Sequence, residues 1–409
     1  MPPPPSALGA LRANRNFRLL WIGQVLSDLG TQIGTLAYPL LVLALTHSPV
    51  IAGTVGTTSS VAALAVRLPA GALADRLDRR RTMILCDAAR TLALAALATL
   101  VAVHAVAWPV VLVVAVIDRA GDTLFTPAAM ATLPLIVPDE QLESAWAVNE
   151  GRTYAANLVG PPLGGILYGL GRAVPLVVDA VSYGISVLTS RGLAGEFAPA
   201  AEPGAERRGL WAEAFDGLRL LWRDPLLRAV LIQAPLLNFA INGAIFTVIL
   251  GLRRNGSSAA VIGGVLAVIM LGGIVGAVLA PQIRSRLTVL RAILLLSVSG
   301  AVLMLVAAAA MPSPAIAVPL ALPFIVAPAT NAALFAILLR RTPAAVHGRV
   351  NAGLLLVASG LAAGAPVLSG LIVDQASAGW AMAFFAASLA LVVPIALLLP
   401  TPPEVSDDA

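Results

Sequence analysis

The sequence has little charge and almost no cysteine or histidine. Only 11% of its 409 residues are charged, whereas about a quarter are charged in soluble domains. A single cysteine, Cys86, excludes an intramolecular disulfide, and the three histidines form no cluster with metal-ligand spacing. We therefore expect neither redox chemistry nor a metal site, and no core of the kind that water-soluble proteins have.

The sequence also lacks the motifs of nucleotide-driven and hydrolytic proteins. It has no Walker loop, glycine-rich dinucleotide turn, nucleophile elbow or zinc motif. We therefore predict a protein that is not an enzyme, needs no cofactor and takes its energy from a proton gradient. The basic residues occur in short clusters between apolar stretches, so the net charge of +5 does not indicate binding to nucleic acid.

Long apolar runs fill the rest of the chain, and 59% of the residues are hydrophobic. Because a backbone in lipid must satisfy its own hydrogen bonds, each run of about 20 residues predicts a membrane-spanning helix. An all-α protein with twelve spans is expected, and no short apolar run followed by a cleavage site precedes the first span. The predicted helices are 17–45, 49–74, 82–103, 106–130, 144–170, 173–193, 226–250, 258–283, 287–310, 313–339, 346–373 and 378–400.

Arginine-rich loops predict the orientation, because short cytoplasmic loops retain positive charge. Most arginines between spans fall on one side, with Arg253 and Arg254 as the exception, which places both termini in the cytoplasm of a bacterial cell. The least apolar stretch, 195–225, is predicted to connect two bundles, 1–194 and 226–409. One face of it is apolar, which favours a helix lying on the membrane over a partner-binding helix; the face consists of Trp211, Phe215, Leu218 and Trp222.

The two predicted bundles repeat each other. The segment from Gly71 to Thr82 matches the segment from Ala277 to Thr288, and the pair Pro161 and Gly165 matches Pro366 and Gly370. Duplicated halves are characteristic of secondary transporters, which bind their substrate at the interface of the repeats. The repeat therefore favours a transporter over a structural membrane protein.

The loop after the second predicted span carries a glycine, a carboxylate and several arginines. It resembles the signature loop of the major facilitator superfamily, in which it acts as a conformational latch; the matching residues are Gly71, Asp75, Arg76, Arg79 and Arg80. In this sequence Asp78 stands where the family has a glycine. The resemblance implies two pseudo-symmetric six-helix bundles.

The fifth predicted span is rich in glycine and proline. It resembles the signature of exporters in the same superfamily and implies antiport; the residues are Gly151, Gly160, Pro161, Gly164 and Gly165. An ordinary kinked packing helix is the alternative. Three further stretches, 125–129, 213–227 and 347–350, resemble the branch that contains enterobactin-type siderophore exporters and macrolide efflux pumps.

Ionisable residues inside a membrane are costly and are therefore candidates for function. Asp28 in the first span and Asp118, Arg119 and Asp122 in the fourth are predicted to couple transport to protons. We expect Asp28 to pair with Arg119, and one of the two carboxylates that are a turn apart to take up a proton more readily. A static buried pair is the alternative. Asp179 is a weaker, solitary candidate.

Asp87 and Arg90, one turn apart, are expected only to lock the structure. The second half is almost free of charge within its spans, and its amides indicate a largely apolar cargo surface or simple helix contacts. The weak candidates for the cavity in both halves are Gln24, Asn157, Gln233, Asn238, Asn242 and Asn331.

These features together predict a monomeric, proton-coupled antiporter that exports an amphipathic small molecule, such as a drug, an antibiotic, a siderophore or another secondary metabolite. Two alternatives remain. One is a facilitator or importer of a nutrient that works without protons, and the other is a transporter-fold sensor or membrane enzyme.

Overall fold

The computed structural model describes residues 11–74, 76–198, 218–342 and 347–397. Within these ranges the chain is helical and contains no strand. The helices of the first half are α2 (Arg15–Thr46), α3 (Pro49–Ala74), α4 (Arg79–Ala102), α5 (Trp108–Ile136), α6 (Asp139–Leu170) and α7 (Val174–Arg191). All six match the predicted spans, with ends that differ by a few residues.

The second half has the other six spans, three of which are interrupted. Its elements are α9 (Pro225–Arg254), α10 (Ala259–Arg286), α11 (Val289–Ala310), η1 (Pro314–Ile316), α12 (Ala317–Phe324), α13 (Ala327–Arg341), α14 (His347–Ala362), α15 (Ala365–Gln375), α16 (Ala378–Ala390) and α17 (Val392–Leu397). The breaks lie beside Pro323, Pro366 and Pro394. Proline lacks the N–H that a continuous helix requires, so these three spans are interrupted within their predicted ranges.

Nine of the helical segments in the described ranges are long and apolar enough to cross a membrane. Helices α5, α6 and α7 are not among them. Helix α5 carries Asp118, Arg119 and Asp122 within five consecutive residues, and each such charge raises the free energy of a helix in lipid. The least apolar spans are therefore all in the first half.

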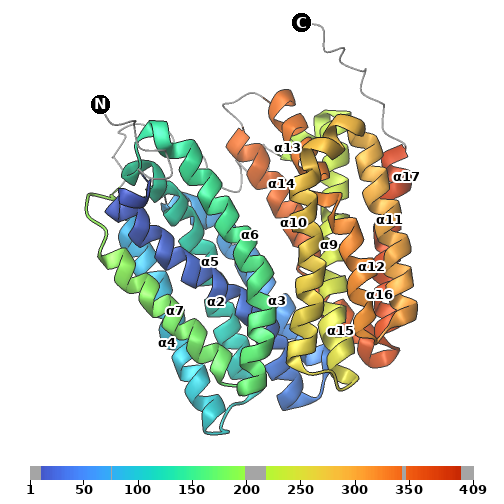
Figure 1. Ribbon diagram of the computed structural model, residues 1–409, viewed down its shortest axis with the longest axis horizontal. Helices are drawn as coiled ribbons and strands as arrows, with labels where there is room; N and C mark the ends of the chain where they lie inside the picture. Colours follow the sequence, from blue (N-terminus) through green and yellow to red (C-terminus); the bar gives the residue numbers. More distant parts are fainter. Residues whose placement is uncertain (1–10, 75, 199–217, 343–346, 398–409) are drawn as a thin grey trace, which may run out of the picture. The chain divides into compact units, whose positions relative to one another are not determined.

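Two compact units make up the chain. Unit 1 comprises residues 1–47, 58–207 and 258–267, and unit 2 comprises 48–57, 208–257 and 268–409. In unit 1, helix α2 packs against α5, α6 and α7, and α4 packs between α5 and α7 (Figure 1). In unit 2, α9 packs against α14, α15 and α16, and α11 packs against α12 and α16. The predicted connector lies mostly outside the described residues, and of its apolar face Leu218 and Trp222 are described, both on a helical stretch.

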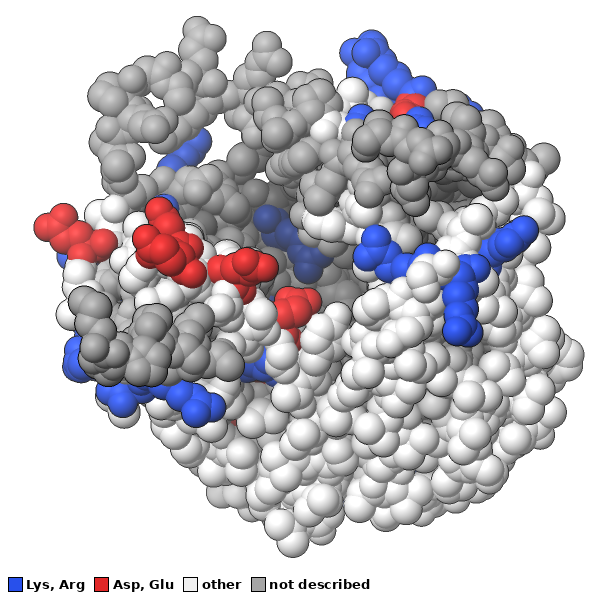
Figure 2. All heavy atoms as spheres, turned by 45° about the horizontal axis from the view of Figure 1, so that its top comes forward, with Lys and Arg blue, Asp and Glu red and all other residues white. Residues whose placement is uncertain are grey.

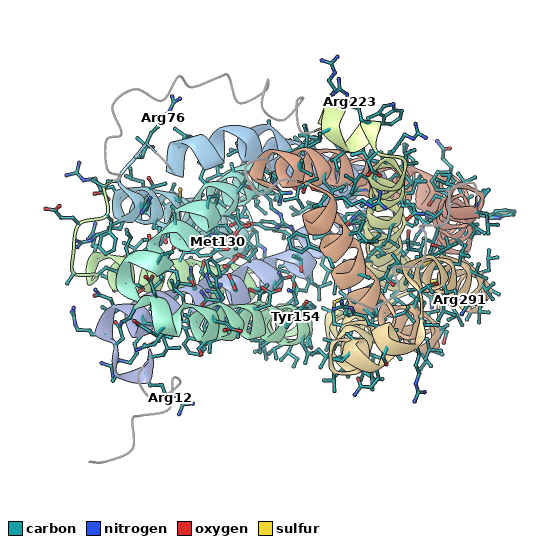
Figure 3. The ribbon with its side chains drawn as sticks, turned by 90° about the horizontal axis from the view of Figure 1, so that it is seen from above. Arg12, Arg76, Met130, Tyr154, Arg223 and Arg291 are labelled. Atoms are coloured by element: carbon teal, nitrogen blue, oxygen red, sulfur yellow. The ribbon has the colours of Figure 1, made fainter. Side chains whose placement is uncertain are left out.

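The charges are unevenly distributed on the surface. In Figure 2 the visible acidic and basic side chains gather at the end of the helices that is turned forward, and the surface below them is almost free of charge. Figure 3 shows Arg12, Arg76 and Arg223 pointing away from the helices, and all three side chains are exposed. An uncharged surface along the helices, with charge at their ends, suits a lipid environment.

Candidate functional site

A buried arginine stands at the centre of unit 1. Arg90 of α4 is 0% exposed. Its Nε lies 2.8 Å from Oδ1 of Asp118 on α5, and its Nη1 lies 3.3 Å from Oδ1 of Asp87, one turn earlier on α4. Oδ1 of Asp122, one turn after Asp118, lies 3.9 Å from Nη2. The pair Asp87 and Arg90, which the sequence suggested as a mere lock, therefore belongs to the same cluster as two predicted coupling residues.

Neighbouring helices complete the surroundings of this cluster. Nη2 of Arg90 donates to Oγ1 of Thr31 on α2 at 2.9 Å and to the hydroxyl of Tyr183 on α7, over whose ring the guanidinium lies at 3.6 Å. Tyr183 and Tyr38 donate to the two oxygens of Asp118 at 3.1 and 3.2 Å. Gly121 of α5 leaves the space for Arg90, because a Cβ there would lie 2.8 Å from its Cδ. Four helices thus enclose one cation.

The cluster contains more acid than base. One guanidinium faces the three carboxylates of Asp87, Asp118 and Asp122. Asp87 and Asp118 are buried, whereas Asp122 is partly exposed. A buried charge without a partner is strongly disfavoured, and this cluster holds more carboxyl groups than its one cation can balance.

A second ion pair joins α2 to α6. Oδ2 of Asp28 lies 3.3 Å from Nε of Arg152, and Nη1 of Arg152 donates to Oε1 of Gln24. The expected pair of Asp28 with Arg119 was therefore wrong. Arg119 has no ion pair among the described residues, because it follows Asp118 directly and so lies about 100° further around α5. The sequence indicated that Asp28 and Arg119 lie at similar depths in their spans, but it did not indicate which way each side chain points from its helix.

Arg152 is not among the residues predicted from the sequence, although a signal was present. The predicted span 144–170 contains Glu150 and Arg152, and both should count as ionisable residues within a span. The tyrosines Tyr38 and Tyr183 carried no such signal, because tyrosine is common in apolar helices. Their roles follow only from the contacts with Asp118 and Arg90.

The arginines of the latch segment bind backbone carbonyls at helix ends of unit 1. Nη1 of Arg79 donates to the carbonyl of Ala131 on α5 at 3.2 Å. Arg80 donates to the carbonyls of Ser190 and Arg191 at the end of α7, where a cation is favoured by the helix dipole. Asp75 lies outside the described residues, Arg76 is exposed, and nothing is described around Gly71.

The latch segment differs from the family pattern at Asp78, which stands where the family has a glycine. Its Oδ1 accepts from the backbone N–H of Arg81 at 2.8 Å and so caps the first turn of α4. Its φ of −58° lies outside the left-handed region, so no glycine is required at this position. The substitution therefore exchanges a flexible residue for a helix cap.

The glycines of the exporter-type segment on α6 are not equivalent. A Cβ at Gly164 would lie 2.9 Å from the carbonyl oxygen of Ile33 on α2, and a Cβ at Gly165 would overlap the carbonyl of Ala259 on α10. Gly160 faces Gln32 in the same close manner, and Pro161 is buried beside them. Gly151 has no atom within 4 Å of such a Cβ, so the expected close packing does not extend to it.

The weak cavity candidates differ in exposure. Gln24 and Gln233 are buried, and Nε2 of Gln233 has no hydrogen-bond partner in the described part of the chain. Three others are accounted for locally, because the side-chain amides of Asn157, Asn238 and Asn242 each donate to the carbonyl one turn earlier. Asn331 on α13 is exposed.

Known proteins resemble this chain along most of its length. The model of the Major Facilitator Superfamily matches residues 20–364. A multidrug efflux pump, Tap, of Mycolicibacterium fortuitum is 28% identical over 69% of this chain and 71% of its own. The enterobactin exporter EntS of Escherichia coli O1:K1 is 26% identical over 98% of this chain and 97% of its own.

Solved structures with the same fold are more distant in sequence. The nucleoside transporter NupG superposes with a TM-score of 0.70 at 15% identity, covering 94% of this chain and 98% of its own. A bacterial homologue of the human lysosomal transporter Spinster, in an inward-facing and unoccupied conformation, gives 0.68 at 15% identity over 95% of each chain. At this identity the likeness concerns the fold alone.

The duplicated halves, the twelve spans, the latch segment and the family match agree with one another. A multi-pass membrane protein of this architecture transports a small-molecule substrate, and its relatives are efflux pumps and exporters. The chain belongs to the Major Facilitator Superfamily of transporters.

Proposed function

We propose that the protein exports an amphipathic small molecule across a bacterial inner membrane in exchange for protons, as a monomer with both termini in the cytoplasm. The observation that most strongly supports this proposal is that three carboxyl groups surround the single cation Arg90 in unit 1. The similarity to the multidrug efflux pump Tap and to the enterobactin exporter EntS supports the outward direction. Asp28, Asp118 and Asp122 are the proposed coupling carboxylates, with Arg90 and Arg152 as their cations.

Exposure separates these carboxylates into two kinds. The side chains of Asp28 and Asp122 are 31% and 32% exposed, whereas that of Asp118 is 6% exposed. A half-exposed carboxylate can exchange a proton directly with water, and a buried one holds the cation in place. We therefore assign proton exchange to Asp28 and Asp122, and the fixing of Arg90 to Asp118.

An apolar cavity in unit 2 supports an amphipathic cargo. It is narrow, with a volume of about 30 Å³, and is bordered by α9, α10, α11, α12, α13 and α16. Its wall includes Leu237, Ile241, Ile269, Met304 and Phe324, and no residue of the lining is charged. Its uncharged lining favours an apolar group of the cargo over a charged one.

Transport into inside-out proteoliposomes tests the proposal. A panel of lipophilic antibiotics and siderophores is offered with an imposed pH gradient, acid inside, and accumulation is compared with that at equal pH. Each coupled proton should raise the accumulation ratio about tenfold per pH unit. The variants Asp28→Asn and Asp122→Asn should lower that ratio while cargo still equilibrates. Equal fluxes with and without the gradient would identify a facilitator, and binding without flux a sensor.

A further inference from the structure

One face of helix α7 is polar and buried from Asp179 to Ser190. Asp179, Ser182, Ser186 and Ser190 recur every three or four residues and are 1%, 6%, 1% and 3% exposed. This spacing places them on one side of the helix. We call these four residues the α7 polar face.

Glycines of α2 lie opposite this face. A Cβ at Gly30 would overlap Oδ1 of Asp179 and lie 2.5 Å from Oγ of Ser182, and a Cβ at Gly23 would lie 3.3 Å from Oγ of Ser186. The glycines therefore let α2 approach directly over the polar side chains. A buried polar interface of this kind costs free energy unless its oxygens find partners.

Asp179 has no cation of its own. Among the described residues it forms no ion pair, its Oδ2 has no hydrogen-bond partner, and the hydroxyl of Ser182 is 3.5 Å from its Oδ1. The charged and titratable groups that act on it are Asp118 of α5, Arg90 of α4, and the tyrosines Tyr38 and Tyr183. The N–H groups of Arg90 already serve Asp118, Asp87, Thr31 and Tyr183.

The corresponding helix contact in unit 2 is packed without a carboxyl group. Asp179 and Phe385 are separated by the same number of residues as Gly71 and Ala277, the matching segments of the repeat. Phe385 of α16 is 0% exposed, and its ring fills the space over Gly243 of α9. The same kind of helix contact is therefore made with an aromatic ring in unit 2 and with a carboxyl group in unit 1.

Two more buried oxygens, on α4 and α7, have no hydrogen-bond partner in the described part of the chain. They are Oδ2 of Asp87 on α4 and Oγ of Ser186 on α7, and both residues are almost fully buried. Ser186 is two turns beyond Asp179, about 10 Å along the helix. Buried polar oxygens that lack protein partners are the positions at which proteins hold internal water. The α7 polar face continues to Ser190, whose carbonyl accepts from Arg80.

We propose that Asp179 binds a proton and exchanges it along the α7 polar face, through Ser182, Ser186, Asp87 and the internal water between them, with the end of unit 1 that carries Arg80. In each step one oxygen accepts a proton and releases another, so that Asp179 is left as a carboxylate and one proton reaches the solvent. The inference rests on the proposed proton coupling and gives the proton a route separate from the half-exposed carboxylates.

Infrared spectroscopy of the reconstituted full-length protein tests the site. The wild type should show a carboxylic-acid C=O band of a buried, protonated group. Asp179→Asn should remove it, and Asp374→Asn, at an exposed position in α15, should leave it unchanged. Ser186→Ala should slow the exchange of the band in D₂O about tenfold or more, because one oxygen of the route is lost. If Asp179→Asn fails to fold, Asp179→Glu should shift the band.

The outcomes separate this inference from the proposed function. A band that persists unchanged in Asp179→Asn or Asp179→Glu overturns the proton site, and exchange at the wild-type rate in Ser186→Ala overturns the route, even where gradient-driven export continues. If the wild type shows no gradient-driven export but loses the band in Asp179→Asn, the proton site stands and the proposed function fails.

Discussion

In unit 1 a glycine of α2 faces the carboxyl group of Asp179, whereas in unit 2 a glycine of α9 faces the ring of Phe385. The residues around these two contacts also differ, being charged in unit 1 and aromatic in unit 2. Arg90 and its carboxylates lie beside the first contact, and three phenylalanine rings, Phe239, Phe384 and Phe385, lie 5.2 to 6.3 Å apart at the second. The comparison shows that the helix contact is compatible with either chemistry, so packing alone does not account for the carboxyl group in unit 1.

The largest effect should follow from removing the central cation. Arg90→Leu leaves the carboxylates of Asp87 and Asp118 buried without a cation, which should lower the free energy of unfolding by about 3–5 kcal/mol at neutral pH. The loss should shrink in acid, because protons then neutralise the carboxylates. Denaturant unfolding of the purified protein at several pH values measures both. A loss independent of pH would mean that Arg90 acts only through its volume.

The matching change in unit 2 is Phe385→Ala, which empties the space over Gly243. We expect a loss of about 2 kcal/mol, less than for a soluble core, because lipid removes most of the hydrophobic contribution and leaves the packing term. This loss should be the same at every pH, since the described residues that cluster with the ring are apolar. The same unfolding experiment decides it, and a pH-dependent loss would contradict the contrast between the units.

Two arginine substitutions in unit 1 test whether Asp28 pairs with Arg152 and not with Arg119. Arg152→Gln removes the ion pair with Asp28 and the contact with Gln24, which should cost about 1.5 kcal/mol. Arg119→Gln, at a side chain without an ion pair in the described part of unit 1, should change the free energy of unfolding by less than about 0.5 kcal/mol. Measured side by side, equal losses would restore Arg119 as a partner of Asp28.

The smallest effects concern the N-terminal caps of α4 and α11. Asp78 caps α4 with a bond of 2.8 Å, and Thr288 caps α11 in unit 2 with a bond of 3.4 Å. Asp78→Ala should cost about 1 kcal/mol and Thr288→Ala about 0.5 kcal/mol, with Asp78→Gly close to the wild type. Thermal unfolding in detergent resolves the order, and an equal loss at both caps would show that the charge of Asp78 adds nothing.

Hydropathy and the repeat were sufficient to predict the fold, because lipid forces each apolar run to satisfy its backbone as a helix. The predicted ends of α2, α3 and α11 lie within two residues of the observed ones. The breaks at Pro323, Pro366 and Pro394 were not predicted, because proline is tolerated within some membrane helices and interrupts others, according to its neighbours.

The sequence predicted which carboxylates belong to the candidate site, but it did not predict which arginine each of them contacts. Asp28, Asp118 and Asp122 were found because a charge within an apolar run is conspicuous. Their partners Arg152 and Arg90 depend on which face each helix turns inward, and the sequence does not contain that rotation when several charges follow one another. Gly121 illustrates the limit, since its importance appears only once Arg90 is seen to lie across it.

The weak apolarity of α5, α6 and α7 has a consequence for biosynthesis. Helices that leave the ribosome one after another enter the bilayer readily only if each is apolar enough on its own. Helix α4 meets that condition, although it carries Arg90, and it precedes α5, which brings Asp118 and Asp122. The nascent chain should therefore hold α4 near the translocon until the carboxylates of α5 arrive, so that the two helices leave it together with their charges already paired.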